Sequence, residues 1–166
     1  HRHQLTTAFD HVMGKSFHNN GETGALGFIR GFLLVIFLVG VLGSGSELLL
    51  MGHTEEFWQY IPLILMAASL AAVIWNGVRR GTGGMRAFQG IMILFVLSGP
   101  AGLILHYQGN AEFEQEMYPS LDGFELFFKA IVGTTPPTLA PGTMILLGLI
   151  GLAFTYKHPV LSAAPE

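Results

Sequence analysis

The 166-residue sequence contains no cysteine. This absence excludes disulfide bonds, cysteine-ligated zinc or iron–sulfur sites, covalent c-type haem attachment and thiol–disulfide chemistry. Charge is also scarce, because Asp, Glu, Lys and Arg make up 11% of the residues, whereas an average soluble domain is about 25% charged. With a hydrophobic content of 51%, this shortage of charge predicts a membrane protein of one domain rather than a soluble protein.

Basic clusters and buried ionisable groups are missing as well. The net charge is −3, and no basic run exceeds the pair Arg79 and Arg80, so the sequence gives no indication of nucleic-acid binding. The long apolar runs contain almost no ionisable side chains, which argues against a proton pump, an ion channel or a carrier of charged substrates. Enzymatic activity is the less favoured alternative for this chain.

The sequence does contain four apolar segments long enough to cross about 30 Å of hydrocarbon as helices. We expect an all-α integral membrane protein whose four transmembrane helices form an antiparallel bundle. The predicted spans cover about 28–52, 57–79, 86–106 and 138–157.

Charged residues indicate how these spans are oriented. Apart from Lys129, the basic residues fall at one end of the predicted bundle, whereas acidic residues dominate the connections at the other end. By the positive-inside rule, we expect both termini in the cytoplasm and the chain in a bacterial cytoplasmic (inner) membrane. The basic residues assigned to the inner side are Arg2, Lys15, Arg30, Arg79, Arg80, Arg86 and Lys157.

The N-terminal arm, residues 1–26, precedes the membrane domain at 27–159, and a short tail follows at 160–166. Leu5 and Phe9 share one helical face of the arm. This spacing predicts an amphipathic helix that rests on the cytoplasmic leaflet or on a partner protein.

The external segment, residues 107–137, is too long to be a plain loop. We expect Asn110 to cap a short helix that ends at Pro119. The Phe and Ile spacing in about 121–132 predicts a second amphipathic helix, which lies on the outer surface.

The candidate site residues are Glu47, His53 and His106, which the predicted spans place at a similar depth near the outer face. Imidazole and carboxylate groups suit a transition metal, and His53 and His106 are also candidates to hold a haem or a porphyrin pigment. No motif fixes two ligands on one helix face. The alternative is that the histidines are ordinary interfacial residues, and that the acids at 112, 114 and 116 form a solvated face.

Small residues are frequent in all four spans and let helices approach closely. Four helices cannot all turn such faces inward, so we expect an accessory or structural subunit of a larger membrane complex. Its partners would be the lipid bilayer and other membrane subunits or a second copy of the chain. One alternative is a membrane redox protein that binds haem, pigment or metal. A weaker one is a carrier of lipid or of a small apolar substrate.

Overall fold

The computed structural model describes residues 2–52, 56–79, 81–132 and 138–162, and for residues 2–23 it describes the backbone alone. Every regular element in these ranges is helical, as the sequence predicts. The elements are α1 (Arg2–Leu50), the 3-10 turn η1 (Phe57–Gln59), α2 (Tyr60–Arg79), α3 (Thr82–Met117), α4 (Gly123–Val132), α5 (Leu139–Thr155) and α6 (Pro159–Ser162).

Three of these helical segments have the length and composition to cross a membrane: Gly24–Leu50, Phe57–Arg79 and Thr82–Met117. Helix α5 is also apolar but has 17 residues, about 25 Å at the rise of an α-helix. The structure is therefore that of an all-α protein with long apolar helices, compatible with insertion in a membrane.

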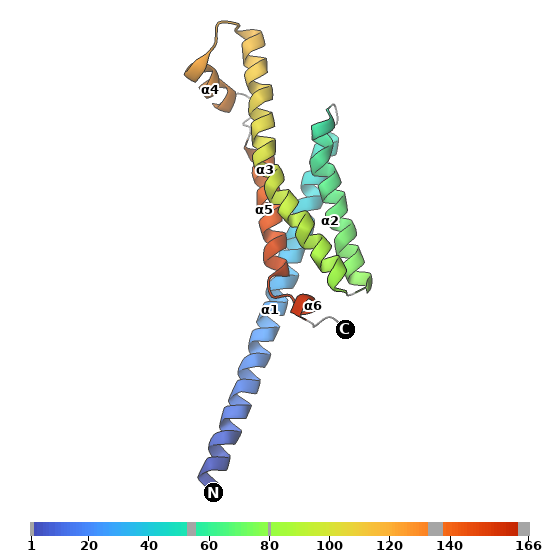
Figure 1. Cartoon of the computed structure of the whole chain (residues 1–166), viewed down its shortest axis with the longest axis vertical. Helices are drawn as coiled ribbons and strands as arrows, with labels where there is room; N and C mark the ends of the chain where they lie inside the picture. Colours follow the sequence, from blue (N-terminus) through green and yellow to red (C-terminus); the bar gives the residue numbers. More distant parts are fainter. Residues whose placement is uncertain (1, 53–55, 80, 133–137, 163–166) are drawn as a thin grey trace.

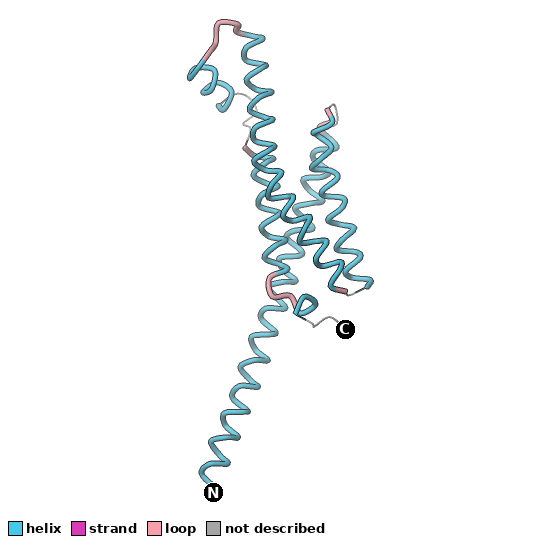
Figure 2. The backbone as a smooth tube through the Cα atoms, viewed as in Figure 1, coloured by secondary structure: helices cyan, strands magenta, loops and turns pink. Residues whose placement is uncertain are grey.

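Helix α1 runs without a break from the N-terminal arm into the first apolar segment (Figures 1 and 2). The arm is helical as predicted, but no turn separates it from the segment that follows. Its amphipathic face stays a prediction, because the side chains of residues 2–23 are not described. The helix ends at Leu50, where Gly52 takes a positive φ of 66°, the backbone conformation that commonly closes a helix.

Helix α3 corrects the prediction for the external segment. Asn110 does not begin a new helix, since α3 continues through it to Met117. Tyr118 and Pro119 then end the helix, and Pro119 does so in the predicted way. The first half of the expected external segment is thus a rigid extension of α3 beyond the apolar run, and α4 folds back against it (Figure 1).

The four long helices pack in the cyclic order α1, α2, α3, α5, and each neighbouring pair is antiparallel (Figure 1). Phe37 of α1 fills the centre, with its ring 5.3 Å from that of Phe88 in an edge-to-face contact. Phe88 makes a second edge contact, 5.8 Å, with Phe154 of α5. Edge-to-face geometry is favoured by the ring quadrupoles, so these aromatics connect three helices.

Glycine allows the closest contact, between α3 and α5. A Cβ added at Gly148 would lie 2.8 Å from the Met92 carbonyl oxygen and 2.8 Å from Val96 Cγ2. Gly99 of α3 likewise meets Ile145 of α5, and Gly151 meets Met92. The expectation that small residues permit close helix approach holds at this interface.

The α3–α5 contact predicts different effects for two Gly→Ala changes on α5. Gly148→Ala forces a methyl group against the α3 backbone, so we expect the unfolding free energy to fall by about 1–3 kcal/mol. Gly142→Ala is the matched control, because nothing lies within 4 Å of its Cβ position. Thermal unfolding in detergent measures both. Equal stability of the two variants would contradict the packing.

At the opposite end of the bundle, Arg30 of α1 holds the end of α5. Its guanidinium donates to the Lys157 carbonyl oxygen at 2.7 Å and to the Tyr156 carbonyl oxygen at 3.2 Å. Tyr156 is the C-cap of α5 and Lys157 follows it, so these two carbonyls lie at and just beyond the negative end of the helix dipole and have no partner within the helix. A cation at this position therefore satisfies them.

His158 caps α6 beside this contact. Its Nδ1 accepts a hydrogen bond from the Val160 N–H at 3.3 Å, and its ring lies 5.5 Å from that of Phe154. Burial lowers the pKa of His158 below 6.5, and the charge of Arg30 lowers it further. The folded state therefore favours the neutral form of the His158 ring.

This lowered pKa predicts a loss of stability in acid. Well above pH 6.5, His158 is neutral in both the folded and the unfolded chain. As the pH falls from 6.5 through the lower folded pKa, the unfolded state binds the proton first and is favoured. The melting temperature of the wild type should fall more between pH 7.5 and pH 5 than that of His158→Asn, which keeps a capping oxygen. If the melting temperatures of the two proteins fall equally with pH, His158 is not the group responsible.

Candidate functional site

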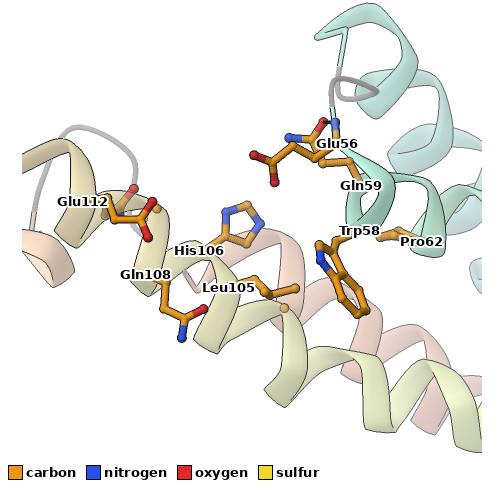
Figure 3. Close-up of a pocket in the computed structure, with 11 residues that line it drawn as sticks. Glu56, Trp58, Gln59, Pro62, Leu105, His106, Gln108 and Glu112 are labelled. Carbon is orange, nitrogen blue, oxygen red and sulfur yellow. Dashed lines mark hydrogen bonds between the residues drawn. The ribbon is translucent and has the colours of Figure 1, made fainter.

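A cavity lies between η1 with the start of α2 and the second half of α3 (Figure 3). It is at the end of the bundle that the sequence predicts to face outward, which we call the outer end. Its volume is about 510 Å³. We call it the outer pocket. It is lined by Glu56, Trp58, Gln59, Pro62, Gly102, Leu105, His106, Gln108, Gly109, Asn110 and Glu112.

The outer pocket forms because α3 and the α1–α2 pair diverge toward this end (Figure 1). Helix α3 contains Pro100, which removes one backbone donor and bends a helix. Gly102, one pocket-lining residue, lies close to Pro141 at the start of α5, where its Cβ would meet Pro141 Cγ at 3.4 Å. At Gly102, α3 therefore stays beside the start of α5, while α2 leans away.

The wall on the side of α2 is held by a capping box. The Glu56 backbone N–H donates to Gln59 Oε1 at 3.2 Å, and the Gln59 N–H donates to the Glu56 carbonyl oxygen at 3.1 Å. The first bond is one half of the capping box and the second closes the 3-10 turn, and together they fix the start of the helix. It presents the Glu56 carboxylate and the Trp58 indole to the pocket (Figure 3).

The opposite wall is α3, which is tied to α4 behind it. Asn110 Nδ2 donates to the Ala130 carbonyl oxygen at 3.0 Å, and the Tyr107 ring lies 5.8 Å from that of Phe127. From this wall, Glu112 reaches toward the pocket from the side opposite Glu56, and the His106 ring lies between them (Figure 3).

Of the three predicted site residues, His106 alone is placed in the outer pocket. Glu47 lies at the outer end of α1 with an exposed side chain and does not line the pocket. His53 lies outside the described residues. Within the described ranges, no three His, Asp or Glu side chains come close enough together to hold a metal ion. The proposed convergence of Glu47, His53 and His106 stays a prediction.

Sequence reasoning missed part of this pocket. Trp58 and Glu56 line the pocket but are not among the site residues predicted from the sequence, and no local motif singles them out. Asn110 was assigned to a helix cap, but its role is to hold α4. Glu112 was assigned to a solvated acidic face, and its side chain is indeed exposed at the edge of the pocket.

Comparison with known proteins gives no relative: no protein-family model, no curated protein and no solved structure matches this chain. Function must therefore be argued from its own residues.

The Asn110 hydrogen bond predicts how firmly α4 is docked. Asn110→Ala removes the donor to the Ala130 carbonyl, at a cost of about 1 kcal/mol. We expect faster amide hydrogen exchange in Gly123–Val132, measured by mass spectrometry on the purified protein. Gln115→Ala, an exposed change on the same helix, is the control and should leave α4 protection unchanged. Unaltered exchange in Asn110→Ala would contradict this role.

Proposed function

We propose that this chain is a four-span integral membrane protein, with both termini in the cytoplasm, that serves as an accessory subunit of a larger membrane assembly. The observation that carries the proposal is the exposed aromatic face of α4. Phe124, Phe128 and Val132 share one stripe of this helix and are 78%, 58% and 63% exposed. We call this stripe the α4 apolar face.

Its position argues for a protein partner. Helix α4 is docked on the extension of α3 that follows the apolar run, through Ala130 and the Tyr107–Phe127 contact. Exposed contiguous apolar surface of this kind marks interaction sites, and aromatic side chains contribute most to the affinity of such interfaces. A neighbouring subunit would bury it.

The four-span topology is supported by charge. Arg30 and Lys157 meet at one end of the bundle, where the positive-inside rule places the cytoplasm. The acidic residues Glu56 and Glu112 lie at the other end. Helix α5 is short for a membrane span. We infer that it crosses the membrane packed against α3, with its ends covered by the neighbouring helices.

Because the chain has no cysteine, single cysteines test this topology directly. Ser120→Cys lies between α3 and α4, and Ser162→Cys follows α5; both positions are exposed. We expect a membrane-impermeant maleimide to label Ser120→Cys in intact spheroplasts and Ser162→Cys only after lysis. Labelling of both from the same side would show that α5 does not cross.

The subunit proposal predicts a stoichiometric partner. Gentle detergent extraction of the tagged full chain, followed by mass spectrometry, should recover one partner protein in a fixed ratio. Phe124→Ser/Phe128→Ser should reduce its recovery more than tenfold, since central aromatic contacts are each worth about 1–2 kcal/mol or more.

Phe113→Ser is the matched control, because Phe113 is 59% exposed on α3 and lies outside the α4 apolar face. It should keep the partner. A chain that remains alone after mild solubilisation and chemical cross-linking would contradict the proposal. If the α4 variants bind the membrane less tightly but still recover the same proteins, the α4 apolar face contacts lipid instead.

A second candidate function rests on His106 in the outer pocket: a membrane redox protein that binds haem, a porphyrin pigment or a metal. The His106 imidazole lines this pocket (Figure 3), and imidazole is a ligand type that suits iron and other transition metals, although within the described residues it belongs to no group of three His, Asp or Glu that could hold a metal ion. Natively extracted protein should then be coloured or carry metal in a fixed ratio that His106→Ala removes. A colourless, metal-free preparation would exclude this function.

Carriage of a lipid or small apolar substrate has less support, because more than half of the lining residues are polar.

A further inference from the structure

We propose that the outer pocket binds an alkylammonium group, either the head of a small organic amine or the amine end of a zwitterionic lipid. The proposal is independent of the subunit role. It rests on the size of the pocket, the sign of its charge, the separation of its two carboxylates and its aromatic lining.

The size suits a small organic group. About 510 Å³ falls within the range of 300–1,000 Å³ that is usual for pockets of small molecules. Pro62 and Leu105 provide apolar contact, while Gln59 and Gln108 are among the polar residues of the lining. Such mixed lining fits a ligand with both carbon and a polar or charged end.

The charge of the pocket is negative. Glu56 and Glu112 line it, and no Lys or Arg is among its lining residues. Lys129, the basic residue of the outer segment, is directed onto the Tyr118 ring, with Nζ 4.2 Å from the ring centroid. The other described basic side chains belong to the opposite end of the bundle. A cleft lined by one sign of charge concentrates ions of the other sign.

The two carboxylates favour an organic cation over a metal ion. They enter the pocket from opposite walls (Figure 3), and the described residues form no group of three His, Asp or Glu that could ligate a metal. A compact divalent ion needs its ligands within about 2–2.6 Å. An alkylammonium group is larger and spreads its charge over methyl or methylene groups. It can therefore lie beside the His106 ring, which separates the two carboxylates (Figure 3), and be attracted by both without drawing them together.

Trp58 supplies the aromatic surface. Tryptophan attracts cations best among the aromatic side chains, and recognition of quaternary ammonium groups is the main functional use of this attraction. Its ring lines the pocket below Glu56 (Figure 3). The combination of an indole with two carboxylates is selective for a soft cation.

Fluorescence of Trp58 provides the test. The chain has two tryptophans, and Trp75→Phe leaves Trp58 as the reporter without touching the pocket. Choline is the probe, and its neutral isostere 3,3-dimethylbutan-1-ol is the control ligand. In the purified full-length protein, choline at constant ionic strength should change the emission in a saturable way, and the neutral isostere should not.

The carboxylates are tested in the same background. Glu56→Gln and Glu112→Gln should each weaken choline binding about two- to fivefold, as expected for exposed charge pairs, and the double variant about tenfold. Glu116→Gln, on the exposed surface of α3 away from the pocket, should bind choline like the parent. Equal responses to choline and to its neutral isostere would overturn the proposal. Unchanged choline affinity in the double variant would also overturn it. So would displacement of choline by Ca²⁺ together with a saturable change in Trp58 emission on addition of Ca²⁺ alone.

Two nanodisc compositions identify the source of the amine. Choline should bind more weakly in phosphatidylcholine discs than in phosphatidylglycerol discs if the lipid head competes for the pocket. Equal choline affinity in both assigns the pocket to a free amine. Either result supports an alkylammonium site, and absence of binding in both overturns it.

Discussion

The rest of this structure depends on the close approach of α3 and α5. Ile145 packs directly onto Gly99, and the Met92 backbone and Val96 pack onto Gly148. Van der Waals packing of this kind drives helix association in lipid, where the hydrophobic effect between helices is absent. This contact places Phe154 of α5 against Phe88 of α3. It thereby completes the aromatic core around Phe37.

The same contact explains the outer pocket. Because α3 stays beside the start of α5 at Gly99 and Gly102, it cannot also follow α2 there. The bend that Pro100 permits then directs the rest of α3 away from the α1–α2 pair (Figure 1). The gap that opens is flanked by Glu56 on one side and Glu112 on the other. The packing that builds the membrane core thus separates the walls of the pocket, and α4 supports one of them.

Much of the fold could be predicted from composition and hydropathy, because length and apolarity alone nearly determine an inserted helix. The second apolar segment, Phe57–Arg79, agrees closely with its predicted bounds. The continuation of α3 through Asn110 could not be predicted, because an Asn is compatible with both a helix cap and a helix interior, and its bond to Ala130 depends on tertiary structure.

For the site, hydropathy predicts only that His106 lies at the outer boundary of a span. That Glu56, Glu112 and Trp58 share a pocket with it depends on how α2 and α3 diverge, which no local pattern encodes.

The most direct test of this account is cross-linking of α3 to α5 in native membranes. Gly99 and Ile145 face each other across the interface, within the range of a disulfide, and the chain has no other cysteine. Gly99→Cys/Ile145→Cys should form an intramolecular disulfide with mild oxidant, whereas Gly90→Cys/Ile145→Cys should not, because nothing lies within 4 Å of a Cβ at Gly90. A membrane-inserted Gly99→Cys/Ile145→Cys protein that keeps both thiols free under oxidation would contradict the arrangement of the bundle.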